Sequence, residues 1–87
     1  MARRSRSETQ KMLKAIVILL RNTTWKCGKV ERLVVEYLRS HLRRYGSPRS
    51  SISEMTQHFN LNGKQKSEFF DALKRLEKRR IIEIRKL

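Results

Sequence analysis

The 87-residue sequence has little of what builds disulfide scaffolds, metal clusters or flexible linkers. It holds one cysteine, one proline and three glycines. The single cysteine, Cys27, excludes an internal disulfide and a thiol cluster for a metal, and it fits a reducing compartment. So few glycines leave no glycine-rich loop that would cradle a phosphate group.

Groups that would converge on one pocket for catalysis are also scarce. His41 falls on the apolar side of a helical pattern, where a hydrogen-bonded core histidine is expected, and His58 is expected at the surface. Neither histidine stands at metal-ligand spacing from the other or from Cys27. The acidic residues are scattered among basic ones. The sequence therefore predicts a protein that is not an enzyme and that binds no metal or cofactor.

Long hydrophobic runs are absent as well. The longest one, 15–20, is shorter than the core of a signal peptide and far too short to span a bilayer. We therefore expect a soluble protein in the cytoplasm, associated with the nucleoid if the cell is prokaryotic.

Acidic residues are scarce beside basic ones, and this imbalance is the strongest signal in the sequence. There are 22 Lys and Arg against 8 Asp and Glu, which gives a formal net charge of +14. Such a charge repels itself, but a bound polyanion makes it favourable, because each neutralised phosphate releases condensed counterions. We expect a nucleic-acid partner, DNA rather than RNA. A solvated basic surface and an anionic membrane are weaker alternatives, and the composition also suits a heat-adapted source.

The N-terminal part divides into an arm and an apolar segment. Residues 1–7 are basic and polar, so they are expected to form a disordered arm before a single domain of residues 8–87. A first helix is predicted over 8–22, with an apolar arc so wide that it needs two partner surfaces. A buried strand at 15–20 is the alternative. The arc favours a homodimer through residues 10–20, with the interface residues Met12, Ile16, Leu19 and Leu20.

Residues 30–45 show the clearest helical pattern of the chain. Apolar side chains recur at i, i+3, i+4 and i+7 over the whole segment, which predicts a helix with one apolar face. Gly46 suits a C-cap, and Pro48 cannot continue the helix. The preceding segment, 23–29, has no periodicity and is a predicted connector, in which Trp25 is expected to plug the core rather than to stack on a base.

Helix caps open the next two segments. Ser51 and Glu54, and again Asn62 and Gln65, stand at the spacing of a reciprocal capping box. They predict two helices joined by a tight turn, over 51–60 and 63–79.

This order of elements resembles the winged helix-turn-helix family over residues 30–85. The residues that carry the resemblance are Ser51-Ile52-Ser53-Glu54-Met55, Leu61 in the turn, and the run from Ala72 to Ile84, which looks like a recognition helix entering a first wing strand. The resemblance implies a mainly α fold with a minimal β-hairpin or strand pair, in which the strand at 81–84 pairs with an extended piece near 49–52. The turn is longer than in the family, and a second wing strand is missing.

The resemblance also implies that the 63–79 helix enters the DNA major groove. Lys64 and Ser67 stand near its start, where base contacts are usually made, but Glu68 and Asp71 on the same outer face repel phosphate. Cations near the helix end suit backbone contacts. The predicted nucleic-acid-binding residues are Arg3, Arg4, Arg6, Arg49, Lys64, Ser67, Lys74, Arg75, Lys78, Arg79 and Arg80.

The sequence therefore predicts a small DNA-binding protein, a transcription regulator or a chromatin-like protein, that binds mainly through phosphate contacts. The alternative is a basic accessory subunit of a nucleoprotein machine, such as a ribosome or a DNA polymerase holoenzyme. In that case the winged helix serves for protein contact, which the carboxylates of Glu68 and Asp71 favour.

Overall fold

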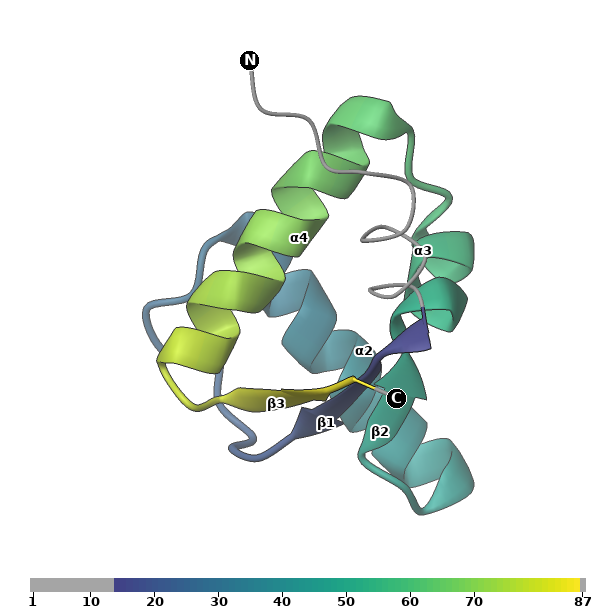
Figure 1. Cartoon of the computed structure of the whole chain (residues 1–87). Helices are drawn as coiled ribbons and strands as arrows, with labels where there is room; N and C mark the ends of the chain where they lie inside the picture. The colour runs from purple at the N-terminus through teal and green to yellow at the C-terminus, as the bar shows by residue number, and fades with distance from the viewer. Residues whose placement is uncertain (1–13, 87) are drawn as a thin grey trace.

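The computed structural model describes residues 14–86 and shows helices packed on a small sheet (Figure 1). The fold is mainly helical with one three-stranded antiparallel sheet, as the sequence indicated in coarse terms. The elements in chain order are β1 (Ile16–Leu19), α2 (Lys29–Tyr45), β2 (Arg49–Ser51), α3 (Ile52–Phe59), α4 (Gly63–Lys78) and β3 (Ile82–Arg85).

The sheet has the strand order β2–β1–β3, so the first strand of the chain lies in the centre. Val17 of β1 stands opposite Ser50 of β2 on one side and Ile84 of β3 on the other. The prediction that the C-terminal strand pairs with residues 49–52 is therefore wrong. That extended piece exists as β2, but it pairs with the other edge of β1, because β1 supplies the apolar strand between them.

Residues 16–19 are thus a strand, which corrects the helix predicted over 8–22 and confirms the alternative of a strand. The part of that helix at 8–13 lies outside the described residues. Val17 and Leu19 face the core, whereas Ile16 and Ile18 are half-buried on the opposite face. A central strand with apolar side chains on both faces reads as an unbroken apolar run, which periodicity cannot distinguish from a helix.

The core lies between the sheet and the helices. Val34, Val35 and Leu38 of α2 and Leu73 and Leu76 of α4 are fully buried in it. Each such side chain contributes about 1.5–3 kcal/mol when it leaves water. The strands add Val17, Leu19 and Ile82 to the same cluster, so the sheet and both long helices share one core.

The predicted helix is confirmed as α2, and its apolar face is only partly buried. Leu33, Leu42 and Tyr45 are 44%, 38% and 68% exposed. They lie on the borders of this face, where the neighbouring elements cover them incompletely. The end of the helix follows the prediction: Gly46 has a left-handed backbone (φ 69°), and its N–H donates to the carbonyl of Leu42.

The caps of α3 and α4 lie where the sequence predicts them, but only the cap of α4 is a reciprocal box. The Glu54 carboxylate accepts a hydrogen bond from the Ser50 hydroxyl instead of from the backbone of Ser51, which corrects the box predicted at α3. The Ser51 hydroxyl accepts a hydrogen bond from the Glu54 N–H at 3.0 Å. At α4 the capping box is complete, with the Gln65 N–H donating to Asn62 Oδ1 (2.9 Å) and the Asn62 N–H donating to Gln65 Oε1 (3.1 Å). Leu61 in the turn is partly buried against the core, as expected.

Candidate nucleic-acid interface

The C-terminal end of α4 meets the loop that joins β1 to α2, residues 20–28 (Figure 1). Backbone hydrogen bonds join them, because the N–H groups of Leu20 and Arg21 donate to the Ile81 carbonyl at 2.8 and 3.1 Å. Next to this junction lies an open hollow of about 410 Å³, which four cationic side chains and one carboxylate line. We call the following set the basic end: Trp25, Lys26, Arg75, Lys78, Arg79 and Arg80.

A buried carboxylate organises the basic end. Glu31 is 7% exposed and lies in the first turn of α2, where the helix dipole favours a negative charge. Its carboxylate accepts a hydrogen bond from Arg75 Nε at 2.9 Å and lies 3.7 Å from Arg79 Nη1. The Arg75 side chain remains 58% exposed. One carboxylate thus fixes two guanidinium groups without cancelling their positive charge.

Arg79 also fastens the loop before α2. Its guanidinium donates to the Trp25 carbonyl at 2.6 Å and to the Lys26 carbonyl at 3.2 Å. A guanidinium has five N–H donors, so the carbonyls and Glu31 occupy much of its capacity. Sequence reasoning placed Arg79 among the phosphate contacts and missed Glu31, because nothing in the local pattern indicates that these distant residues meet.

Two cations of the basic end have a left-handed backbone. Lys26 has φ 55° and Arg80 has φ 58°, and the only other described non-glycine residue with positive φ is Asn60. Arg80 follows the last turn of α4, where its N–H donates to the Glu77 carbonyl and the Ile81 N–H donates to the Leu76 carbonyl. This is the Schellman arrangement, in which glycine is the usual residue. A side chain with Cβ costs about 1 kcal/mol there.

Trp25 is 69% exposed, so the prediction that it plugs the core is wrong. The loop is held through its backbone by Arg79, which leaves the indole in solvent. The Lys26 ammonium lies 4.7 Å from the centroid of the indole ring, a cation–π distance. The polar neighbours of Trp25 in the sequence were the available sign of exposure.

The predicted contacts on α4 are exposed, but carboxylates lie among them. Lys64, Ser67 and Lys74 are all exposed along the helix. Glu68 and Asp71 are exposed between them. Their negative charge weakens the attraction of phosphate to the middle of the helix. At the C-terminal end the exposed carboxylate of Glu77 lies among Lys74, Arg75, Lys78 and Arg80, so cations outnumber it there.

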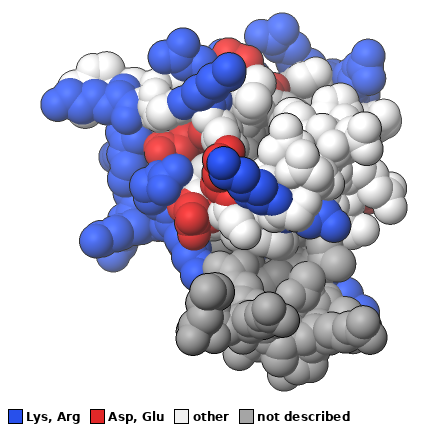
Figure 2. All heavy atoms as spheres, turned by 90° about the horizontal axis from the view of Figure 1, so that it is seen from above, with Lys and Arg blue, Asp and Glu red and all other residues white. Residues whose placement is uncertain are grey.

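Charge is unevenly distributed over the face seen in Figure 2. Most Lys and Arg side chains lie to the left and along the upper edge, with Asp and Glu among them, and the right side is mainly uncharged. In Figure 1 the left is the side of the β1–α2 loop and of the C-terminal end of α4. On this face, cations thus outnumber carboxylates on the left and along the upper edge.

The remaining predicted contacts are elsewhere. Arg49 is exposed on β2 opposite Ile18 of β1. Its neighbour Ser50 is buried, so alternation along the strand places Arg49 on the sheet face away from the helices. The structure therefore does not bring Arg49 together with the basic end. Arg3, Arg4 and Arg6 lie outside the described residues.

The predicted dimer interface is changed by the strand assignment. Leu19 is 8% exposed within the core, and Ile16 is half-buried in the central strand. Leu20 is 54% exposed, and Met12 lies outside the described residues. The wide apolar arc consists of the two faces of a strand, so it no longer argues for a second subunit. Homodimerisation itself stays a prediction.

Comparisons of the chain with known protein families, with curated proteins and with solved structures found no match. Within residues 14–86, every helix is too short or too polar to cross a membrane. The geometry and charge of the described residues therefore carry the functional argument.

Proposed function

We propose that the chain is a nucleic-acid-binding protein that holds the phosphate backbone, that of DNA in the first place, at its basic end. A formal net charge of +14 favours a polyanionic partner. At the basic end, cations from the β1–α2 loop and from the end of α4 share one open hollow. A phosphate backbone that passes over this hollow would contact several of them at once.

The observation that carries the proposal is the left-handed backbone of Lys26 and Arg80. Glycine would relieve the strain at either position, yet both positions hold a long cation at the same end of the molecule. Strain that a fold tolerates locally often accompanies function. We infer that these two side chains are placed for a ligand rather than for stability, and phosphate is the ligand that their charge suits.

Within this proposal, β2, α3, α4 and β3 follow one another as in a winged helix-turn-helix, with α3 and α4 as the helix pair. We propose that α4 approaches nucleic acid by its C-terminal end. Glu68 and Asp71 disfavour deep insertion of the middle of α4 into a groove. Binding should then depend mainly on phosphate contacts and little on base sequence.

Arg80→Gly tests the carrying observation, because stability and binding should move in opposite directions. The free energy of unfolding of the variant should be about 0.5–1 kcal/mol higher, because glycine fits the left-handed position. Its affinity for duplex DNA should fall, and the slope of log K against log salt should decrease by about one. Unfolding in urea and fluorescence anisotropy at several salt concentrations measure the two effects.

Arg49→Ala is the matched control, because this exposed arginine lies on the outer face of the sheet. It should leave the salt slope close to that of the unchanged protein, whereas Lys78→Ala should lower it by about one. Binding to duplex DNA that does not depend on salt would contradict the proposal. So would an Arg80→Gly variant that gains stability and keeps full affinity and slope.

The second candidate is an accessory subunit of a nucleoprotein machine, in which α4 contacts another protein. Exposed Glu68 and Asp71 favour it, because carboxylates on the outer face of a helix suit a basic protein surface better than phosphate. Purification from cells distinguishes the two candidates: co-purification with a ribosome or polymerase supports the second, and free protein on DNA supports the first. Glu68→Ala with Asp71→Ala should release the protein from such a complex but tighten binding to DNA.

A further inference from the structure

All tyrosine, phenylalanine and histidine rings of the chain form one connected series. The sequence holds two tyrosines, three phenylalanines and two histidines. Neighbouring ring centroids in the series lie 4.7–6.2 Å apart. From neighbour to neighbour the order is Tyr45, His41, Tyr37, His58, Phe59, Phe69 and Phe70.

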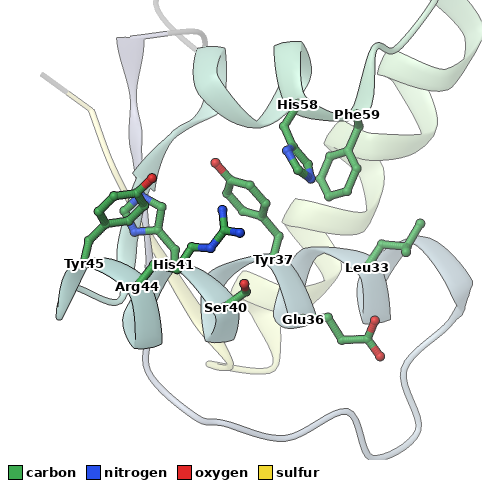
Figure 3. Close-up of a pocket in the computed structure, with 9 residues that line it drawn as sticks. All are labelled: Leu33, Glu36, Tyr37, Ser40, His41, Arg44, Tyr45, His58 and Phe59. Carbon is green, nitrogen blue, oxygen red and sulfur yellow. The ribbon is translucent and has the colours of Figure 1, made fainter.

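The outer part of this series lines a groove between α2 and α3 (Figure 3). The groove has a volume of about 370 Å³. The rings of Tyr45 and His41 lie at one end of it, those of His58 and Phe59 at the other, and Tyr37 lies between them. The lining is completed by Leu33, Glu36, Ser40 and Arg44. We call this set of residues the aromatic groove.

Hydrogen bonds fix the inner rings of the groove. The Tyr37 hydroxyl lies 3.3 Å from the Ser50 hydroxyl, which in turn donates to the Glu54 carboxylate at 3.2 Å. His41 Nδ1 donates to the Ser47 carbonyl at 3.1 Å. These rings are therefore held in place before any ligand arrives, which lowers the entropy cost of binding.

The outer rings contribute little to the core. Tyr45 is 68% exposed, and its ring lies tilted by 50° beside that of His41, at 4.7 Å between centroids. His58 is exposed as well, although its ring lies 4.8 Å from that of Tyr37. The exposed rings of Tyr45 and His58 thus lie beside the fixed rings of His41 and Tyr37, and a planar ligand can stack on them. Arg44 extends into the groove towards Tyr37 and supplies a cation beside the rings.

We propose that the aromatic groove binds one unpaired nucleobase of a single-stranded nucleic acid. This inference rests on the proposed function and extends it to a second surface with a different ligand chemistry. The base stacks on the exposed ring of Tyr45, with the tilted ring of His41 beside it, and the Arg44 guanidinium contacts the base plane or the adjoining phosphate. Stacking of this kind tolerates any base, because every base has an aromatic face.

The lining favours a nucleobase over a protein helix. A helix docks in a groove lined by aliphatic side chains at successive turns. Here only Leu33 is aliphatic, and the other lining residues are aromatic rings or polar and charged groups. The positive charge of the whole chain also selects a polyanionic strand over most proteins.

Tyr45→Leu tests the groove, because it removes the ring at an exposed position and keeps the fold. The probe is a short fluorescein-labelled single-stranded oligodeoxynucleotide of mixed sequence, with a blunt-ended duplex of the same sequence beside it. Affinity for the single strand should fall about tenfold, as expected for the loss of one stacked base. Affinity for the duplex should stay unchanged. Tyr45→Phe, which keeps the ring, should bind the single strand as the unchanged protein does.

Two controls separate the groove from the basic end. Trp25→Leu removes an exposed ring outside the groove, so it should leave the tenfold effect of Tyr45→Leu intact when the two changes are combined. The salt slope for the single strand should be the same for Tyr45→Leu as for the unchanged protein, because a lost stacking contact releases no counterions.

The inference on the groove would be overturned if Tyr45→Leu bound the single strand with full affinity, or lost affinity for single strand and duplex alike. It would also be overturned if Tyr45→Phe failed to restore binding. In these cases salt-dependent duplex binding would leave the proposed function standing. Failure of the unchanged protein to bind either probe in dilute buffer would overturn both.

Discussion

The two ends of α4 are built on opposite principles. At the N-terminal end, Asn60 takes the left-handed position and Asn62 forms a reciprocal capping box, so each residue is one that local preference selects. At the C-terminal end, Arg80 takes the left-handed position that glycine usually holds. The same helix thus begins in agreement with local preference and ends in conflict with it.

Under the proposed function, this difference separates the demands of stability from those of binding. The turn before α4 has only to join two helices, and its residues do this at little cost. The turn after α4 presents cations at the basic end, where side-chain charge has been kept at the expense of backbone strain. Such a local conflict is expected at a functional site.

The largest expected effect comes from Leu76→Ala, which removes a core side chain beneath the C-terminal end of α4. Leu76 is fully buried, and its carbonyl accepts the N–H of Ile81 across the last turn. Removing the side chain leaves a cavity and should lower the free energy of unfolding by about 2–5 kcal/mol. Urea denaturation measures it. A loss below about 1 kcal/mol would mean that the C-terminal end of α4 is packed more loosely than its burial indicates.

Glu31→Gln should have the next largest effect, because it removes the charge that fixes Arg75 and Arg79. We expect a loss of about 1–2 kcal/mol, less than for a fully buried pair, because both arginines still reach solvent. Thermal unfolding checks it. Glu83→Gln is the control: it breaks the exposed pair with Arg85, whose side chains are 65% and 42% exposed, and should change little. Equal effects would refute the organising role of Glu31.

Asn62→Ala tests the N-terminal end of α4, where the capping residue is one that helices prefer. Loss of the side-chain acceptor at the cap should cost about 1 kcal/mol of stability. Affinity for DNA should not change, because the cap lies at the other end of α4 from the basic end. Urea unfolding measures the stability, and fluorescence anisotropy measures the affinity for DNA, on the same preparation of the variant. A large loss of DNA affinity without unfolding would move the binding surface towards the start of α4.

Lys26→Gly should have the smallest effect on stability, and of the opposite sign. Glycine relieves the left-handed backbone, but its freedom in the unfolded chain offsets part of this, so a gain of about 0.5 kcal/mol remains. The cation–π contact with Trp25 is lost, and the fluorescence of this single tryptophan reports it. A clear loss of stability would show that the Lys26 side chain holds the loop together.

The helices from residue 29 onwards could be predicted because their signals are local. The caps at Ser51 and Asn62 and the glycine at 46 mark the helix ends to within about two residues. The strand β1 was assigned to a helix, since its apolar run fits both structures. Only the two partner strands, which lie far along the chain, decide between them.

The candidate site was predicted only in part, because local signals can be read from the sequence and contacts between distant segments cannot. The cations at the end of α4 stand out in the sequence, and the structure brings them together. The role of Glu31, the attachment of the loop by Arg79 and the exposure of Trp25 all depend on contacts between distant segments. The aromatic groove was missed because its rings come from α2 and α3, and no local pattern shows that His58, expected at the surface, meets Tyr37.

The position of β1 has a consequence for how the molecule is assembled. The middle strand of the sheet comes first in the described chain, and its partner β3 comes last. Closing so long a loop costs entropy before any contact repays it, so pairing of β1 with β3 should be slow beside helix formation. During synthesis β1 must remain without this partner until translation has reached residue 85. The growing chain therefore leaves the apolar strand β1 without this partner throughout that time, and a chaperone would be of most use then.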